Sequence, residues 1–252
     1  MAAFGGYPQN VTFSTVNVAK GGGSENLLIN PRGKINQLNE PDGVLSAGVY
    51  FCDGWKAGAS GAEVYRDPDG FRLISGSIVQ LVTNNLGAGR NLRVNMDVIS
   101  GSPVMSINGG SDNVVSSDSE FISLEISGNN SKFNRIILAE SLEIPVYQQS
   151  SDELEPCLKF CYRVTTDELS PQNSAGILID EYQTGGGYGT YTLSLPKRMY
   201  SNPAVTFDLS IIGNVSSWSA SSGKDAITLL FRASTAGWMN YYFKGLIADA
   251  RL

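Results

Sequence analysis

The side chains that could carry catalysis in this chain are carboxylates, tyrosines and lysines, because the sequence contains no histidine. The chain by itself therefore cannot form a Ser-His-Asp triad, a Cys-His dyad or a His-ligated zinc or iron site. A glycosidase needs two carboxylates that face one cleft, about 5–10 Å apart. Asp180 and Glu181 are adjacent on an expected strand, so they point to opposite faces. We expect a protein that is not an enzyme and has no catalytic residues.

Two further patterns resemble ligand-binding motifs without matching them. Asp67-Pro-Asp-Gly70 looks superficially like a calcium loop, but it lacks the further oxygen ligands and the terminal glutamate, so we interpret it as a β-turn. Gly58–Glu63 and Gly185–Gly189 are glycine-rich without the Gly-Lys-Ser/Thr ending of a phosphate loop, and we interpret Gly185–Gly189 as a hairpin tip. We expect no cofactor and no metal ligands, and a structural calcium ion elsewhere stays open.

The aromatic residues of the C-terminal part are the strongest candidates for binding. Sugar rings have apolar faces that stack on exposed tyrosine and tryptophan, while amides take their hydroxyl groups. The candidates flank Gly185–Gly189, lie in a serine-rich expected loop, or share one face of the last strand by period-two alternation. The candidate ligand-binding residues are Tyr182, Tyr188, Trp218, Trp238, Asn240 and Tyr242.

Charge and cysteine content exclude several other classes. The 252 residues carry a net charge of −6, which argues against charge-driven binding of nucleic acid or anionic membranes. No apolar stretch reaches the length of a membrane span, so we expect no membrane insertion. Cys157 and Cys161 could pair if their segment were helical, but we expect free buried thiols. The three cysteines and the absence of a signal peptide favour synthesis in a reducing cytosol.

The elements that must position these residues are short β-strands. Leu92–Val98 and Ile122–Ile126 alternate apolar and polar residues with a period of two. Strong turn signals separate such segments, and we interpret Ser75-Gly76-Ser77 as a hairpin-like turn. The low charged fraction of 17% and the 28 glycines also favour turn-rich β structure. The sequence therefore predicts an all-β fold of antiparallel, jelly-roll-like sandwiches.

The chain divides into three expected parts. Residues 1–24 form a short arm, in which Val11–Val18 alternates like a strand before a glycine-rich linker; a lone strand is unstable, so the arm should dock on another chain or a larger assembly. Residues 25–150 and 151–252 form two β-sandwich modules. Between them, Glu140–Lys159 is rich in acids and prolines and is typical of a junction, with a helical turn expected at Ser151–Leu154.

Several stretches resemble receptor-binding and fibre-tip proteins of tailed bacteriophages. Asn26–Gln37 (NLLINPRGKINQ) resembles the NLLIN-G-F-x-I-W-Q opening of a jelly-roll module in that family. Gly48–Ala57 (GVYFCDGWKA) is similar to its G-x-Y-x-A-D-R-W segment, and Glu153–Arg163 (ELEPCLKFCYR) to its E-L-x-x-C-Q-R-Y-Y junction. The family's C-terminal sandwich is similar to three further stretches: Tyr191–Phe207, Gly213–Ser217 and Gly245–Leu252.

The chain departs from the family pattern at positions that the resemblance implies are structural. Pro31–Lys34 replaces a glycine and an aromatic residue, Asn36 stands where a tryptophan precedes the glutamine, and Gly54 replaces an arginine. The expectation for the fold therefore stands. The glycan site varies among such proteins and is not carried over.

The resemblance implies two β-sandwich modules in a homotrimer that is displayed on the virion, the first similar to non-catalytic carbohydrate-binding jelly rolls. On this basis we expect a short tail fibre or spike, made in the bacterial cytoplasm, that binds a host cell-surface polysaccharide without cleaving it. Residues 1–24 would bind other virion proteins. Two alternatives stay open: a structural head-decoration, collar or adaptor protein, and a glycan depolymerase that uses carboxylates.

Overall fold

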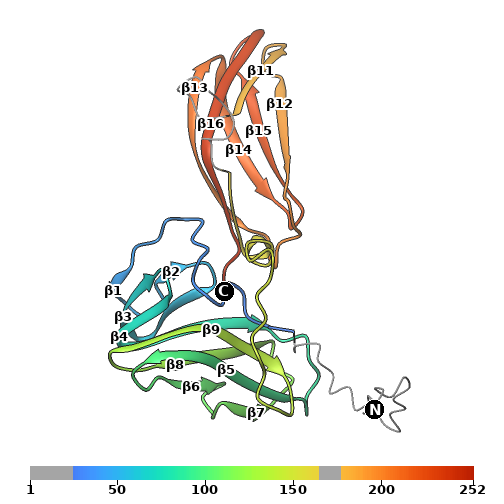
Figure 1. Cartoon of the computed structure of the whole chain (residues 1–252). Coiled ribbons are helices and arrows are strands. Elements are labelled where there is room, and N and C mark those ends of the chain that lie inside the picture. The colour runs from blue at the N-terminus through green and yellow to red at the C-terminus, as the bar shows by residue number, and fades with distance from the viewer. Residues whose placement is uncertain (1–24, 165–176) are drawn as a thin grey trace, which may run out of the picture.

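The structure of the chain is a computed structural model that describes residues 25–164 and 177–252, with the side chains of 177–180, 208–212 and 240–244 left out (Figure 1). The expected N-terminal arm lies outside the described residues. Within them every strand pairing is antiparallel, and the helical structure is one 3-10 turn, η1 (Cys157–Lys159). The expectation of an all-β, antiparallel fold is confirmed.

The N-terminal part contains nine strands: β1 (Gly43–Leu45), β2 (Tyr50–Cys52), β3 (Trp55–Asp67), β4 (Gly70–Thr83), β5 (Asn91–Ser100), β6 (Val104–Ile107), β7 (Asn113–Val115), β8 (Phe121–Ser127) and β9 (Ser131–Glu140). They form one hydrogen-bonded sheet that folds over itself at the long strand β4. The first half of β4 pairs with β9 at Phe71–Leu73, and its second half pairs with β8 at Ser77–Thr83. Two layers therefore share one strand.

Gly76 lies between the two halves of β4 and allows this bend. Its φ is +81°, and a Cβ at this position would lie 2.3 Å from the carbonyl oxygen of Gly61 in β3. Our interpretation of Ser75-Gly76-Ser77 as a hairpin turn is wrong, because the glycine bends a continuous strand instead of ending it. The two-residue turn at Asp67-Pro-Asp-Gly70 is confirmed, since Asp67 pairs directly with Gly70.

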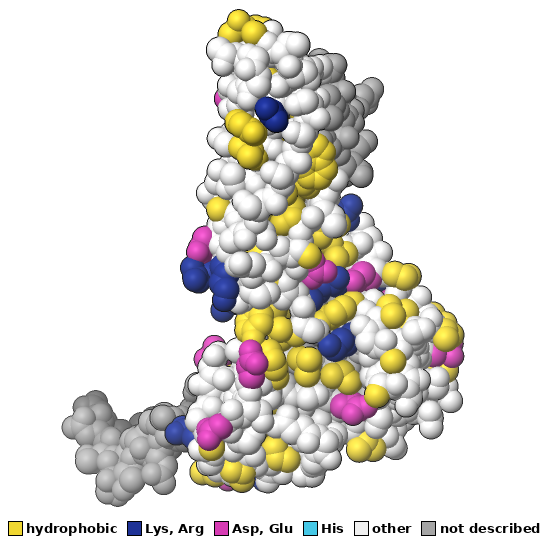
Figure 2. Space-filling view, turned by 180° about the vertical axis from the view of Figure 1, so that it is seen from behind, with side chains coloured by type: hydrophobic (Ala, Val, Ile, Leu, Met, Phe, Trp, Pro, Cys, Tyr) yellow, Lys and Arg dark blue, Asp and Glu magenta, His cyan; other side chains and the backbone are white. Residues whose placement is uncertain are grey.

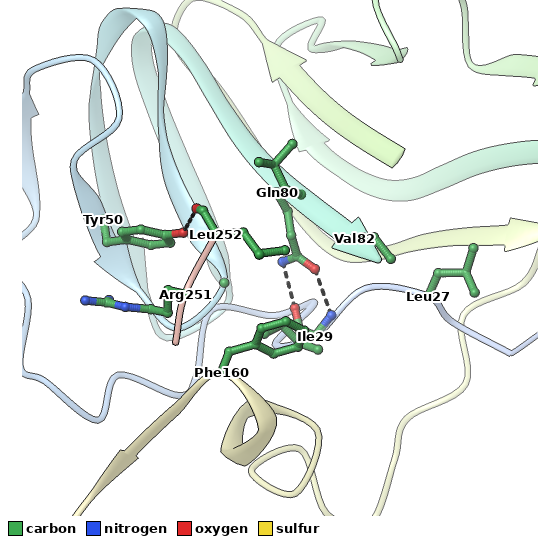
Figure 3. Close-up of a pocket in the computed structure, with 10 residues that line it drawn as sticks. Leu27, Ile29, Tyr50, Gln80, Val82, Phe160, Arg251 and Leu252 are labelled. Atoms are coloured by element: carbon green, nitrogen blue, oxygen red, sulfur yellow. Dashed lines mark hydrogen bonds between the residues drawn. The ribbon is translucent and has the colours of Figure 1, made fainter. Parts of the chain in front are cut away.

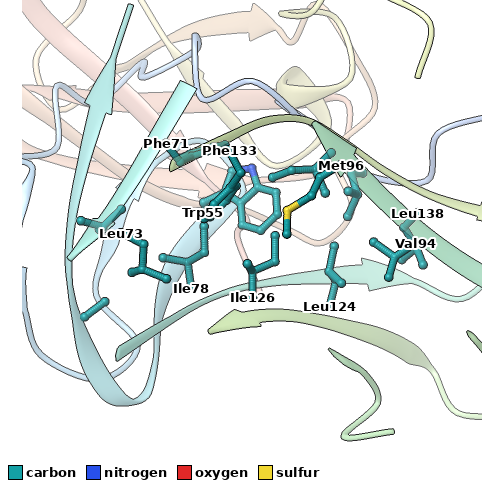
Figure 4. Packing of buried hydrophobic residues seen from close by; sticks show 14 of the residues in the cluster. Trp55, Phe71, Leu73, Ile78, Val94, Met96, Leu124, Ile126, Phe133 and Leu138 are labelled. Carbon is teal, nitrogen blue, oxygen red and sulfur yellow. The ribbon is translucent and has the colours of Figure 1, made fainter. Parts of the chain in front are cut away.

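The space between the layers is filled by an aromatic core (Figure 4). Trp55, Phe71 and Phe133 are fully buried, with ring centroids 5.4 Å apart for the first pair and 5.9 Å for the second. The alternating apolar residues of β5 and β8 belong to the same cluster, as period-two patterning requires: Leu92, Val94, Met96, Ile122, Leu124 and Ile126.

The segment that follows β9 forms a strap over the outer side of this sheet. Ile137 and Ala139 alternate with the core residues of β9 and yet are buried, and Ile137 lines a groove together with Tyr147 of the strap. The Asn95 side chain donates a hydrogen bond to the carbonyl oxygen of Pro145 and holds the strap beside β5. The outward residues of the strap are exposed aliphatics: Leu142 (75%), Ile144 (66%) and Val146 (69%).

The expected helical turn is displaced along the chain. At Ser151–Leu154 the Asp152 carboxylate accepts the backbone N–H groups of Leu154 and Glu155, both at 3.0 Å, and the helical turn η1 follows only at Cys157. Asp152 caps this irregular turn because its side chain satisfies donors that have no other partner there. The prediction of a helix at Ser151–Leu154 was therefore wrong in its position.

The C-terminal part contains two further sheets around a second hydrophobic cluster. One sheet comprises β10 (Cys161–Arg163), β16 (Gly237–Asp249), β11 (Ile177–Gln183) and β13 (Ala204–Gly213); the other orders β12 (Tyr188–Ser194), β15 (Ala226–Ala233) and β14 (Val215–Ser222). The expected hairpin tip at Gly185–Gly189 is wrong, because the turn connects β11 in one sheet to β12 in the other.

The last residues of the chain join the two clusters through a polar contact (Figure 3). The Tyr50 hydroxyl donates to the carbonyl oxygen of Leu252, and Lys56 Nζ donates to the same oxygen at 2.7 Å. Arg251 forms ion pairs with Glu40 of the N-terminal part and with Asp249 of β16. Only about 40 Å³ of space is left between the residues of Figure 3, so the contact is nearly filled.

Candidate functional site

The candidate site lies at the end of the C-terminal sheets that faces away from this contact. Strand β16 ends beside β10 and β13, where Asp249 pairs with both Cys161 and Ala204. Its first residues, Gly237 and Trp238, pair with the end of β11 at the opposite end of the sheet. Hydrophobic side chains reach the surface at this far end, which we call the tip (Figures 1 and 2).

Tyr182 and Trp238 form an exposed aromatic platform at the tip. They are cross-strand partners in β11 and β16, their ring centroids are 5.7 Å apart at 76°, and they are 59% and 61% exposed. Because Met239 is fully buried, alternation turns Trp238 to the outer face of its sheet. Asn240 and Tyr242 lie two and four residues after Trp238 in β16, but their side chains lie outside the described residues.

Tyr188 lies on the other sheet and faces the opposite way. It is 55% exposed, next to the buried Gly189 in β12, and the Arg232 guanidinium of β15 lies 5.6 Å from its ring centroid. The side chain of Glu181 extends over Gly189 from β11: a Cβ at Gly189 would lie 2.1 Å from the Glu181 carboxylate. This carboxylate accepts a hydrogen bond of 2.6 Å from Gln183.

Trp218 differs from the sequence-based expectation. It lies in strand β14, not in a loop, and its ring packs 4.9 Å from that of Phe207 in β13. Its 46% exposure is the smallest among the four described aromatic candidates. Trp218 therefore covers the edge between the two sheets, and the four described aromatic candidates lie in three separate places.

The turns of the tip are held by hydrogen bonds that keep this arrangement in place. Asn214, with φ +55°, accepts the N–H of Thr235 at 2.8 Å and donates to its carbonyl oxygen at 3.0 Å, which ties the β13–β14 turn to the β15–β16 turn. Ala233 N–H donates to the carbonyl oxygen of Gly187, which lies in the turn between β11 and β12. Asparagine tolerates the left-handed conformation that this position requires.

The acidic turn after β3 is neutralised by neighbouring cations. Lys132 Nζ lies 3.0 Å from Asp67 and 2.6 Å from Asp69, and Arg72 lies 3.1 Å from Asp67. The hydrogen bond from Arg72 lowers the pKa of Asp67, and that from Lys132 lowers the pKa of Asp69. The part of the chain that the structure describes contains no cluster of three metal-ligating side chains.

The three cysteines are free and buried, as expected. Burial raises the pKa of the Cys161 thiol to about 12 and also raises the pKa of Cys52 and Cys157. The neutral thiol is a poor nucleophile, so these side chains serve as small core residues.

Within residues 25–164 and 177–252 the structure contains no helix of the length and apolar character needed to cross a bilayer. Comparison of the chain with protein-family models, with curated proteins and with solved structures gives no match.

Proposed function

We propose that this protein is a bacteriophage virion appendage, a short tail fibre or spike, that binds a host-surface glycan without cleaving it. The observation that carries the proposal is the Tyr182–Trp238 platform, two large exposed rings at the tip. The tip is the end of the C-terminal sheets that lies away from the N-terminal strands (Figure 1). Large exposed apolar groups are costly in water, and grouped at a tip they mark a contact surface. Their ring faces suit the apolar face of a sugar.

Binding at each tip should be weak, because each sugar hydroxyl exchanges contacts with water for contacts with protein. We propose that a homotrimer with residues 1–24 attached to the particle presents several copies, so that avidity supplies the overall strength. A rigid tip favours this mode, since little side-chain and loop entropy is lost on binding. The hydrogen bonds of Asn214 provide that rigidity.

The second candidate function is a structural collar or adaptor protein. It is supported by the exposed strap, whose aliphatic side chains favour contacts between subunits. Leu142, Ile144 and Val146 are three exposed aliphatic side chains at alternate positions of the strap, and we refer to them as the aliphatic row. Such rows are typical of surfaces that are covered in an assembly. In the homotrimer that we propose, a neighbouring copy of this chain covers the row.

Replacing Ile144 and Val146 together with serine is expected to shift the protein towards monomer, because the row loses most of its apolar area. Light scattering across a concentration series measures the change. Val44, which is 83% exposed on β1, supplies the control: Val44→Ser should leave the oligomeric state unchanged. Assembly that is equally stable in the double variant would exclude the strap as the subunit contact.

The glycan proposal is tested by replacing Trp238 with alanine. We expect a loss of binding of about 5- to 30-fold on an array of bacterial surface polysaccharides, because a stacked ring contributes about 1–2 kcal/mol per site. Trp218→Ala is the matched control: it also removes a tryptophan but should retain binding, since that ring covers a sheet edge.

Three outcomes would contradict the proposal. Wild-type protein that binds no polysaccharide favours the structural role. Equal binding by the Trp238→Ala variant moves the site away from the platform. New reducing ends in a polysaccharide incubated with the protein would show a depolymerase.

A further inference from the structure

The outer face of the β12–β15–β14 sheet carries a second set of side chains at the tip. Leu229 and Phe231 are buried, so alternation turns Leu230 and Arg232 of β15 outward. In the strand register Arg232 is aligned with Tyr188 of β12 on one side and with Ser217 of β14 on the other. An aromatic ring, a guanidinium and a hydroxyl therefore lie in one row across three strands.

Arg232 is exposed and has no acidic partner among the described residues. Its guanidinium is held near the ring of Tyr188, at 5.6 Å from the centroid. Its Nη2 atom is 4.0 Å from the Cβ position of Gly186. Because this residue is glycine, the turn places no side chain beside the guanidinium at that point.

The rows below the arginine continue with hydroxyl groups. Thr190 and Thr192 are exposed on β12, and Ser219 and Ser221 are exposed on β14. The Thr192 and Thr228 hydroxyl oxygens lie 3.3 Å apart across the β12–β15 pair. Hydroxyl groups both donate and accept hydrogen bonds, as sugar hydroxyls do. The outer face of the β12–β15–β14 sheet can therefore bind further sugar units of a saccharide chain whose acidic sugar lies at the arginine.

We propose that Tyr188, Arg232 and Ser217 form a subsite for the carboxylate of an acidic sugar, with Arg232 as the specificity-determining residue. This inference rests on the proposed glycan-binding function and adds a second site for an acidic sugar, on the opposite sheet from the Tyr182–Trp238 platform. A guanidinium binds a carboxylate through two parallel N–H···O bonds, which a point charge cannot reproduce. Tyr188 supplies a ring face for the sugar, and Ser217 supplies a hydroxyl for its ring substituents.

The test is a titration of the full chain with glucuronate, galacturonate and N-acetylneuraminate, followed by NMR at the Arg232 Nε–Hε resonance. We expect a saturable shift with at least one acid and none with its methyl ester, and a weakening of binding as salt rises. Arg232→Gln should weaken the interaction about tenfold through loss of the charge-assisted pair, and Arg232→Lys should restore only part of it. Arg198→Gln, which removes an exposed arginine near Asp225, should change nothing.

The failures of the two proposals are distinguishable. If the protein binds polysaccharide through Trp238 but Arg232 responds to none of the three acids, the acidic subsite is wrong and the glycan-binding function stands. If the methyl esters shift Arg232 as strongly as the acids, the carboxylate is not what the subsite recognises and the inference is overturned. If neither polysaccharides nor acids bind, both proposals fall.

Discussion

Replacing Trp55 with alanine is expected to lower the free energy of unfolding of the N-terminal part by about 3–5 kcal/mol, the usual cost of removing a buried tryptophan. The ring is fully buried between the layers that β4 connects, and it packs against Phe71 (Figure 4). Its removal leaves a cavity that the rigid strands cannot close. Because domains are stable by only about 5–15 kcal/mol, this substitution would remove a large fraction of the stability of the N-terminal part.

The loss also includes one hydrogen bond. Trp55 Nε1 donates to the carbonyl oxygen of Asn30 at 2.9 Å, and Asn30, itself 1% exposed, holds the loop up to Ile35 through its own side chain. Trp55→Phe retains ring packing but removes one of the two hydrogen bonds that this carbonyl oxygen accepts, the other coming from Gly33 N–H. We therefore expect an intermediate loss of about 1–3 kcal/mol, from the missing hydrogen bond and the smaller ring.

The free energy of unfolding of both variants is measured by denaturation in guanidinium chloride, followed by circular dichroism. Trp238→Ala is the matched control and should change the free energy of unfolding by less than about 1 kcal/mol, because its ring is mostly exposed. A Trp55→Ala variant as stable as Trp238→Ala would show that the aromatic core does not hold the layers together.

The sequence predicts which faces of many strands are buried, because period-two alternation is a local property. Leu124 and Ile126 were assigned inward from neighbours alone, and both are fully buried. Gly76 was misread because a glycine between two serines looks the same in a turn and in a bend. The difference is set by Gly61 on another strand, whose carbonyl oxygen approaches so closely that only glycine fits.

At the candidate site, too, alternation along a strand could be predicted from the sequence, whereas contacts with other strands could not. Alternation placed the consecutive residues Trp238 and Met239 on opposite faces of β16, but only the packing of the second sheet determines that Met239 is the buried one. Arg232 was missed as a candidate, although its alternation with Phe231 already indicated an outward side chain. Its alignment with Tyr188 depends on strand register, which no local pattern contains.

The polar contact made by Arg251 is the second place where one substitution should have a large effect. Arg251 and Glu40 are 11% and 15% exposed, and Arg251 lies over the Tyr50 ring at 4.3 Å while it also pairs with Asp249 at 2.8 Å. Burial raises the pKa of Glu40 even though Arg251 attracts its charged form. Burial also opposes ionisation of Asp249, but the side-chain and backbone hydrogen bonds from Arg251, together with its charge, outweigh burial and lower the pKa of that carboxyl.

Arg251→Met, which retains the apolar stem, is expected to lower the free energy of unfolding by about 2–4 kcal/mol at pH 7. This lies between the small value of an exposed ion pair and the cost of breaking a fully buried one. Without the guanidinium, two carboxylates are left in a partly buried site, so their pKa values in the folded variant rise above those of the unfolded chain. Their charge then destabilises the variant at neutral pH, and this penalty disappears as the pH falls through the raised values.

The wild type behaves in the opposite way at Asp249. Its lowered pKa gives a stabilisation that is present above the unfolded value of about 4 and is lost as the pH falls through the folded value. The stability gap between wild type and Arg251→Met should therefore narrow from pH 7 to pH 4 in chemical unfolding measured at both values. Arg198→Met removes an ion pair whose partners are 69% and 63% exposed, so it should cost less than about 1 kcal/mol at either pH. A gap that stays constant with pH, or that equals the Arg198→Met control, would mean that packing and not charge joins the C-terminal residues to the N-terminal part.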